Sequence, residues 1–334
     1  MNRPVRERSP LQGGRMRRRA RVWPLPVAVA TLLFAGGAAA VIAEGGGSSG
    51  GKRAGLEVVK APHRNRGKGH HGETIPPGIQ LHGGRRVHVR LRPPAAGGLL
   101  FDVDTGHVLW SHDPLVVRPI ASLTKIMTAL LVVEHTNNQA QAKIGPDALH
   151  YTGSEVGVLP LGKDVSVNAL MYGLLLPSGN DAAVALADRI AGSDQNFAKM
   201  MNRRAHQLDL RCTHFVSSYG LQDGNRSCPV DVAALSRIVM ARPRVAKIVA
   251  TWHARLPFPI KGGWLDLYSH NPLMRLRYPG TIGLKTGFTN PAGKCFVGIA
   301  RRGSHTLGAV LLNSMDIGGQ ARQLLDAGFQ AEPG

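Results

Sequence analysis

Cysteine is scarce in this sequence, with three residues among 334. None of their spacings resembles a zinc site, so we expect no structural zinc. Cys212 and Cys228 could close one loop by a disulfide, which in the chain-entropy model stabilises a fold by roughly 3 kcal/mol. Cys295 lies in the apolar run KCFVGIA and is expected to be a buried thiol.

Acidic residues are also few: 21 Asp and Glu oppose 41 Lys and Arg, which gives a formal net charge of +20. Residues 1–93 hold 18 of the basic residues and 4 of the acidic ones. A basic tail of this kind binds nucleic acid, anionic lipid or an acidic wall polymer, or is merely solvated. We expect no nucleic-acid partner, because the tail lacks aromatic side chains interleaved with its charges.

A single charge-free run is long enough to cross a membrane, and it extends from Val22 to Ala43. About 20 apolar residues span a bilayer. Eight arginines between Arg3 and Arg21 precede the run and should stay cytoplasmic, so everything after it is expected to be exported. Two interpretations of this run stay open: a retained membrane anchor, which we favour, and a signal peptide cleaved near the small residues Ala38–Ala40.

The sequence therefore divides into four expected parts. Residues 1–21 form a basic cytoplasmic segment, and residues 22–43 form the anchor or signal peptide. Residues 44–94 are rich in Gly, Arg, His and Pro with little apolar periodicity, which predicts a flexible linker. Residues 95–334 form the folded domain, located in the cell envelope outside the cytoplasm, and they are numerous enough to bury a sizeable core.

Hydrophobic periodicity within residues 95–334 predicts both strands and helices. Two β-rich runs on either side of Asp104-Thr105-Gly106 predict a hairpin over residues 98–110. Helices are expected after Ser122 and over residues 165–176, 178–191 and 321–329, and strands over residues 281–287, 294–303 and 305–313. This order argues for an α/β fold in which helices cover a mainly antiparallel sheet, with a helical subdomain.

Ser122 and Lys125 stand three residues apart at the start of the first expected helix. Positions i and i+3 share a helix face, so the lysine nitrogen can reach the hydroxyl and take its proton. The alternative is a helix cap followed by a surface lysine, and Ser49-Gly-Gly-Lys52 repeats the pattern in the tail. A free lysine has a pKa near 10.4, so action as a base near neutrality requires a decrease of about 3 units. Burial or a second cation must supply that decrease.

Ser178-Gly-Asn180 lies at a forced break between two apolar helices, because Pro177 ends the first of them. At such a break Ser can relay a proton and Asn can orient a lysine or a substrate amide. The alternative is a capping box completed by Asp181. Ser269-His-Asn271 has the same form, so the tripeptide alone does not identify a site.

Lys285-Thr286-Gly287 lies on the first of the expected C-terminal strands. The lysine supplies a second cation and the threonine a hydroxyl beside it, and both could hold a substrate carboxylate. Gly287 leaves the strand edge open for an extended peptide. By itself the tripeptide is weak evidence, whereas the three motifs in this order are much stronger together.

The ordered set Ser-x-x-Lys, Ser-x-Asn and Lys-Thr-Gly is shared by penicillin-binding proteins and serine β-lactamases. The stretches PIASLTKIMTAL, YGLLLPSGNDAAVALA, THFVSSYGL and YPGTIGLKTGFTNPAGKC narrow that choice. Through them, residues 97–329 resemble the serine-type D-alanyl-D-alanine carboxypeptidases, the low-molecular-mass penicillin-binding proteins. The resemblance implies a β-lactamase/transpeptidase-like fold and no metal or organic cofactor.

The resemblance assigns catalytic roles to four residues. Ser122 is implied as the acylated nucleophile and Lys125 as the general base that activates it. Ser178 and Asn180 are implied to relay protons and to position the substrate.

Substrate binding is implied for the strand motif and the residue after it. Lys285 and Thr286 are expected to bind the terminal carboxylate of D-Ala-D-Ala. The oxyanion hole is expected to consist of the backbone N–H groups of Ser122 and Phe288, the latter following Gly287 on the strand.

The implied reaction removes the terminal D-alanine from peptidoglycan stem peptides through an acyl-enzyme, with β-lactam antibiotics as covalent inhibitors. Three alternatives stay open: a D-alanyl endopeptidase of the same fold, a class A-like β-lactamase and a noncatalytic wall-binding module. Class A enzymes use a glutamate between the second and third motifs to activate the deacylating water. No Glu occurs here between Glu155 and Glu332, which argues against that alternative.

Two elements common in this family are not recognised in the sequence. Members often carry a C-terminal β-rich domain and an amphipathic membrane helix. The run of residues 22–43 is expected to replace that membrane anchor, so the membrane is an expected partner through the N-terminal segment.

Overall fold

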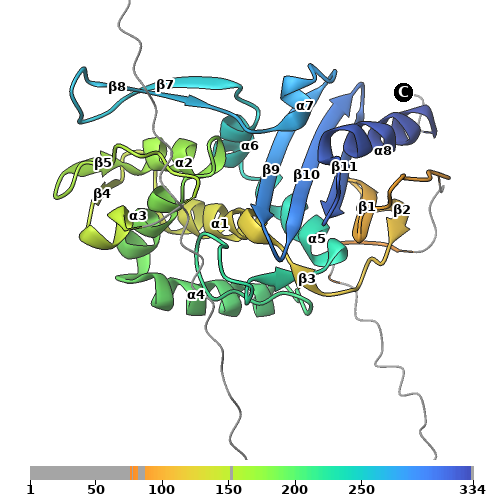
Figure 1. Ribbon diagram of the computed structural model, residues 1–334, viewed down its shortest axis with the longest axis horizontal. Coiled ribbons are helices and arrows are strands. Elements are labelled where there is room, and N and C mark those ends of the chain that lie inside the picture. The colour runs from red at the N-terminus through yellow and green to blue at the C-terminus, as the bar shows by residue number, and fades with distance from the viewer. Residues whose placement is uncertain (1–75, 77, 82–86, 151–152, 332–334) are drawn as a thin grey trace, which may run out of the picture. The chain divides into compact units, whose positions relative to one another are not determined.

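The computed structural model describes residues 76, 78–81, 87–150 and 153–331 (Figure 1). The segments expected at residues 1–21 and 22–43, most of the expected linker and the Ser49–Lys52 repeat of the first motif lie outside these residues. No helix within the described part of the chain is long and apolar enough to cross a membrane.

A five-stranded antiparallel sheet forms the centre of the domain, with the strand order β2-β1-β11-β10-β9. Its strands are β1 (Gly97–Asp102), β2 (Val108–His112), β9 (Thr281–Thr289), β10 (Gly293–Arg302) and β11 (His305–Leu312). The expected hairpin and the three expected C-terminal strands are therefore confirmed. β9 and β2 are the two edges of this sheet, which places the Lys-Thr-Gly motif on an edge strand.

Helices cover both faces of the sheet, as expected for the α/β class. They are α1 (Lys125–His135), α2 (Val167–Leu175), α3 (Asn180–Ala191), α4 (Asp194–Gln207), α5 (Pro229–Met240), α6 (Pro243–Val249), α7 (Pro272–Arg275) and α8 (Ile317–Ala331), with 3-10 turns η1 (Ala121–Thr124) and η2 (Pro146–Leu149). α8 packs on one face, and α5 and α6 pack on the other. Strands β10 and β11 are buried over most of their length, which explains their nearly continuous apolar sequences.

The helical subdomain consists of α2, α3 and α4 around α1 (Figure 1). Eight of the eleven residues of α1 are buried, because α1 contacts this subdomain on one side and α5 and α6 on the other. The first motif of the sequence therefore begins a central helix rather than a surface helix.

Two expected helices begin two residues later than predicted. The helix predicted from residue 165 begins at Val167, because residues 164–166 form strand β5 (Asp164–Ser166), which pairs with β4 (Gln141–Lys143). The helix predicted from Ser178 begins at Asn180, because Ser178 has a φ of 68°, in the left-handed region.

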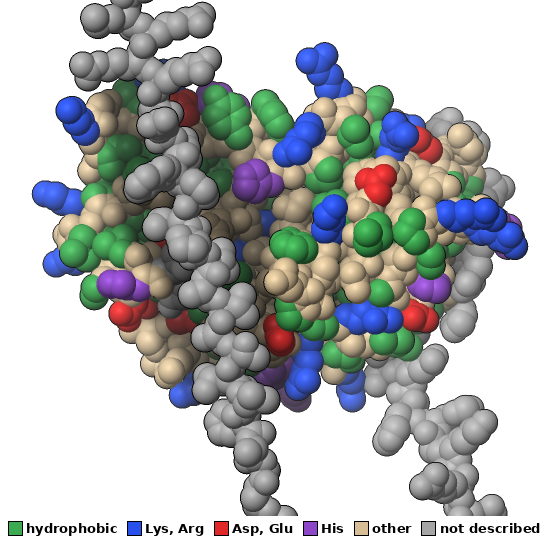
Figure 2. Space-filling model, in the orientation of Figure 1, with side chains coloured by type: hydrophobic (Ala, Val, Ile, Leu, Met, Phe, Trp, Pro, Cys, Tyr) green, Lys and Arg blue, Asp and Glu red, His purple; other side chains and the backbone are tan. Residues whose placement is uncertain are grey.

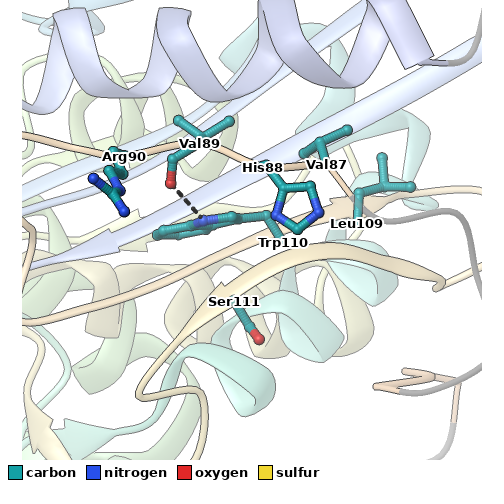
Figure 3. Close-up of a pocket in the computed structure, with 7 residues that line it drawn as sticks. All are labelled: Val87, His88, Val89, Arg90, Leu109, Trp110 and Ser111. Carbon is teal, nitrogen blue, oxygen red and sulfur yellow. Dashed lines mark hydrogen bonds between the residues drawn. The ribbon is translucent and has the colours of Figure 1, made fainter.

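The described residues before Ala95 pack on the domain, so the expected linker over residues 44–94 is wrong at its C-terminal end. Ile79, Leu81 and Leu91 are buried in the core. Figure 3 shows residues 87–90 beside Trp110 of β2, whose Nε1 donates a hydrogen bond to the Val89 carbonyl at 3.1 Å. Together these residues line a hollow of about 660 Å³ at the β2 edge of the sheet. The alternation of Val and Leu with His and Arg in this segment was the sequence signal for packing.

Three two-stranded sheets complete the described fold: β4–β5, the pair β3 (Arg118–Pro119) with β6 (Arg226–Ser227), and the hairpin of β7 (His253–Pro257) with β8 (Trp264–Tyr268). Cys212 and Cys228 form a disulfide, and Cys295 is a buried free thiol, so both cysteine predictions are confirmed.

Candidate active site

Ser122 lies in the turn η1, partly exposed, directly before α1. The chain bends sharply here because Ala121 has a φ of 48°. Gly220 packs against this bend so closely that a Cβ at residue 220 would overlap the Ala121 carbonyl oxygen. The Ser122 hydroxyl is consequently held 3.0 Å from Lys125 Nζ and 3.5 Å from the Tyr219 carbonyl oxygen.

Lys125 is fully buried at the start of α1, and three oxygen atoms surround its nitrogen. Nζ lies 3.0 Å from Ser122 Oγ, 2.7 Å from Asn180 Oδ1 and 2.7 Å from the Tyr219 carbonyl oxygen. As an ammonium it donates to all three. As a neutral amine it can donate to the amide and the carbonyl while its lone pair accepts the Ser122 proton.

The neutral form of Lys125 is favoured by its surroundings. Burial lowers its pKa well below the usual value, the positive charge of Lys285 lowers it further, and the carboxylate of Asp181 acts in the opposite direction. The two causes of the decrease are those that the sequence required, burial and a second cation. The surface-lysine alternative is therefore wrong for Lys125.

Asn180 begins α3, and its side chain reaches Lys125 rather than a helix end. The capping-box alternative for this motif is also not observed, because the Asp181 carboxylate accepts hydrogen bonds from the backbone N–H groups of Val156 and Gly157. The Asn180 backbone N–H in turn donates to the Ser154 carbonyl at 2.7 Å. These hydrogen bonds hold residues 154–157 against the start of α3.

Ser178 is 4% exposed, and its hydroxyl has no hydrogen-bond partner among the residues that the structure describes. A buried hydroxyl without a partner costs about 1–3 kcal/mol relative to a satisfied one. The left-handed conformation of Ser178 adds backbone strain. Both features are typical of a residue whose partner is a water or a ligand.

Lys285 lies in the middle of β9 with 2% of its surface exposed. Burial lowers its pKa to about 7. Its Nζ donates one hydrogen bond, to the Thr286 carbonyl at 2.8 Å, so further N–H donors have no partner within the described residues. This ammonium can bind an anion without breaking a contact with the protein.

Gly287 allows β9 to approach the turn that carries Ser122. A Cβ at residue 287 would stand 2.9 Å from the Ser122 backbone nitrogen, closer than side chains tolerate. Thr286, partly exposed, precedes it, and Phe288 follows with 61% of its surface exposed. The strand motif and the serine motif therefore meet, and Figure 2 shows the surface hollowed between the helical subdomain and the sheet.

The second Ser-x-Asn tripeptide, Ser269-His-Asn271, has a structural role. The Asn271 side chain accepts a hydrogen bond from the Leu273 backbone N–H and so caps α7. Its Nδ2 donates to the Gly283 carbonyl on β9 at 2.9 Å. The contacts, rather than the tripeptide sequence, distinguish the two occurrences.

No sequence pattern predicts the role of the Tyr219 carbonyl, which accepts a hydrogen bond from Lys125 Nζ. The loop that presents it is held by Thr128, whose hydroxyl donates to the Ser218 carbonyl, and by Asn225, whose amide accepts from the backbone N–H groups of residues 216 and 217. A backbone carbonyl has no sequence signature of its own. The sequence indicated this loop only through its position between Cys212 and Cys228, whose disulfide closes it.

One group of metal-type ligands occurs in the described residues: Cys212, Cys228 and Asp231. The disulfide occupies both sulfur atoms. The Asp231 carboxylate accepts hydrogen bonds from the Cys212 backbone N–H and the Thr213 hydroxyl. This group is therefore explained by the covalent structure and does not offer a metal site.

Comparison with known proteins gives consistent results. The model of the D-alanyl-D-alanine carboxypeptidase family matches residues 92–316. A Mycobacterium tuberculosis D-alanyl-D-alanine carboxypeptidase, DacB2, is 36% identical over 250 residues, which cover 72% of this chain and 84% of that protein. The Bacillus subtilis carboxypeptidase DacF is 31% identical over 70% of this chain and 62% of its own length. A Pseudomonas aeruginosa D-alanyl-D-alanine endopeptidase is 32% identical over 61% of this chain and 70% of its own length.

Solved structures are similar as well. The crystal structure of a D-alanyl-D-alanine carboxypeptidase from Mycobacterium tuberculosis matches with a TM-score of 0.67 and 31% identity, over 78% of this chain and 97% of that one. The crystal structure of a Streptomyces DD-transpeptidase matches with a TM-score of 0.66 and 31% identity, over 71% of this chain and 97% of that one.

Proposed function

The chain belongs to the D-alanyl-D-alanine carboxypeptidase family, and we propose that it removes the terminal D-alanine from peptidoglycan stem peptides by way of an ester on Ser122. The observation that carries the assignment of the site is the 3.0 Å contact between Ser122 Oγ and the nitrogen of a fully buried lysine. Burial and the positive charge of Lys285 lower the pKa of this lysine well below its usual value, so its neutral form can take the Ser122 proton. A nucleophile beside such a base is the arrangement that covalent catalysis requires.

Acylation begins when neutral Lys125 takes the Ser122 proton. Ser122 Oγ then attacks the carbonyl carbon of the penultimate D-alanine, and the tetrahedral intermediate collapses as the C–N bond breaks. The leaving D-alanine amine takes a proton, which Lys125 supplies directly or through Ser178. Water attacks the ester in the second half of the reaction and regenerates the Ser122 hydroxyl.

Two groups near β9 hold the substrate in this proposal. Lys285 and Thr286 bind its terminal carboxylate, and the spare N–H donors of the buried ammonium support that role. The backbone N–H groups of Ser122 and Phe288 bind the developing oxyanion. Removing a donor of this kind typically costs roughly 3–4 kcal/mol of transition-state stabilisation.

The endopeptidase alternative concerns specificity within the same chemistry. Both carboxypeptidases and endopeptidases of similar identity occur among the relatives, and both would use the same three motifs. We favour the carboxypeptidase because the family model and the first relatives carry that name. The missing glutamate between Glu155 and Glu332 supports slow deacylation of β-lactam adducts over β-lactamase activity.

The decisive experiment is intact mass measurement after treatment with penicillin. The wild type should gain one penicilloyl group, and Ser122→Ala should gain none. Release of D-alanine from a soluble pentapeptide ending in D-Ala-D-Ala then separates a carboxypeptidase from an endopeptidase and from a noncatalytic module. Adduct formation by Ser122→Ala, or rapid turnover of penicillin, would contradict the proposal.

The proposed substrate lies in the cell wall, so the proposed site of action is the envelope outside the cytoplasm. Membrane attachment through residues 22–43 is part of this proposal and rests on the charge-free run and the arginines before it. Extraction of the full chain from cell membranes by detergent, but not by salt, would support retention of the segment.

A further inference from the structure

The hairpin of β7 and β8 has one buried and one exposed face. Ala254, Leu265 and Leu267 point into the core, and β7 contacts α2. The exposed face carries the alternate residues, which pair across the strands as His253 with Tyr268, Arg255 with Asp266, and Pro257 with Trp264. Two large aromatic rings therefore lie on the solvent side of a short sheet that nothing in the described chain covers.

The side chains of the exposed face hold one another in fixed positions. The His253 ring stacks on the Tyr268 ring with 4.5 Å between centroids, and His253 Nε2 lies 2.8 Å from Asp266 Oδ1. Arg255 lies 4.0 Å from Asp266 Oδ2 and 5.3 Å from the centre of the Trp264 ring. The five residues form a continuous row with an aromatic ring at each end, about 13 Å apart for a four-residue separation along a strand. We call this row the aromatic platform.

The base of the hairpin adjoins the active site. The Ser269 backbone N–H donates to the Trp252 carbonyl at 2.8 Å, and the His270 N–H donates to the Leu176 carbonyl at 3.1 Å, two residues before Ser178. The His270 ring is close enough to Lys285 for that charge to lower its pKa, after the larger effect of burial. From this base the hairpin extends past α2, away from β9 (Figure 1). A ligand on the platform and a peptide on β9 can therefore belong to one molecule.

The chemistry of the aromatic platform fits a neutral sugar polymer. Sugar rings have an apolar C–H face that stacks on aromatic rings, and a polar edge that hydrogen-bonds to charged and imidazole side chains. A lipid bilayer fits less well, because Arg255 and Asp266 lie between the two rings and would lose their water. A polyanion also fits less well, because these two charges are of opposite sign.

We infer that the aromatic platform binds the glycan strand to which the substrate peptide is attached, a chain of N-acetylated amino sugars. This inference rests on the proposed function, because that function supplies a substrate whose peptide is joined to such a chain. The platform then increases the capture of polymeric substrate without touching the reacting atoms. Exposed apolar patches next to a site commonly mark this kind of binding surface.

The test compares the double variant Trp264→Ala/Tyr268→Ala with the wild type and with Met315→Ala, which removes an apolar side chain that is 70% exposed outside the hairpin. Binding to glycan strands stripped of peptide is measured by co-sedimentation, so the result does not depend on catalysis. The double variant should bind at least about tenfold more weakly, which corresponds to about 1.4 kcal/mol, whereas Met315→Ala should bind as the wild type.

Kinetic measurements separate this inference from the proposed function. D-Alanine release from intact peptidoglycan should decrease about tenfold in the double variant through a higher KM, while release from a short soluble pentapeptide stays unchanged. Equal glycan binding by all three proteins would overturn the inference. So would weaker binding of the double variant to vesicles of anionic phospholipid with unchanged glycan binding. If the wild type released no D-alanine at all, the proposed function would fail while the binding result still stood.

Discussion

Two buried lysines, Lys125 at the start of α1 and Lys285 in the middle of β9, differ in what surrounds their nitrogen atoms. Three oxygen atoms of the protein lie within 3.0 Å of Lys125 Nζ, and one of them is the Ser122 hydroxyl. Within the part of the chain that the structure describes, Lys285 Nζ has one hydrogen bond, to the carbonyl of the next residue. The same residue type is therefore built into a protein network at one place and left with spare donors at the other. The first environment suits a base, and the second suits a ligand-binding cation.

Removing Lys125 should have the largest effect on the rate of acylation. In Lys125→Met the Ser122 hydroxyl loses its proton acceptor, and general-base catalysis contributes about a hundredfold to ten-thousandfold. We expect acylation by penicillin to slow by about a thousandfold while the protein stays folded. Stopped-flow acylation and thermal unfolding measure the two properties. Lys199→Met, which removes an exposed lysine of α4, is the matched control and should acylate normally.

Removing Lys285 should impair binding more than chemistry. In Lys285→Met the substrate carboxylate loses its buried cation, and deleting one member of such a pair typically costs about 2–5 kcal/mol. We expect kcat/KM for the pentapeptide to decrease about a hundredfold, mainly through KM. The division of roles between the two lysines would be wrong if kcat decreased by that factor with KM unchanged.

Two asparagines near these lysines also differ in their roles. Asn180 contacts Lys125 directly, whereas Asn271 caps α7 and bonds to Gly283, two residues before Lys285. Asn271→Ala should lower the free energy of unfolding by about 2 kcal/mol, because it removes a cap and a buried hydrogen bond. Urea denaturation measures that loss, and acylation per folded molecule should stay within about twofold. Asn180→Ala should instead slow acylation about tenfold or more, and the reverse ranking would contradict this division.

Much of the fold was predictable from sequence because its signals are local. The strands over residues 281–313 carry continuous apolar runs. Cys212 and Cys228 had one competing cysteine, Cys295, and its apolar surroundings predicted a buried thiol instead of a disulfide. The helix starts at residues 167 and 180 were not predictable. The start at residue 167 depends on the pairing of β5 with a strand more than twenty residues away in the sequence. The start at residue 180 depends on the left-handed backbone conformation of Ser178.

The candidate site was predictable to the level of its side chains but not of its backbone. Ser122, Lys125, Asn180 and Lys285 were identified through an ordered motif set, and the structure brings the first three into contact. The Tyr219 carbonyl was missed, because every residue type has a carbonyl and only tertiary packing of the loop aims this one at Lys125. The packing of residues 87–91 was missed because glycines and arginines nearby obscured a short alternating pattern.

The electrostatic coupling of the two lysines gives the smallest predicted effect. It tests directly whether the charge of Lys285 lowers the pKa of Lys125. Acylation requires neutral Lys125, so its rate should rise as pH increases through the pKa of Lys125 and then level off. Lys285→Met removes a positive charge that lowers this pKa, so the acidic limb of the profile should move to higher pH. Because burial is the larger cause, we expect a shift of about one unit at most, equivalent to about 1.4 kcal/mol. A small sulfonyl fluoride without a carboxylate is the appropriate probe, because its capture does not need Lys285. Lys294→Met, which removes an exposed lysine of β10, should leave the profile in place. A shift to lower pH, or none, would mean that the Lys285 charge does not reach the base.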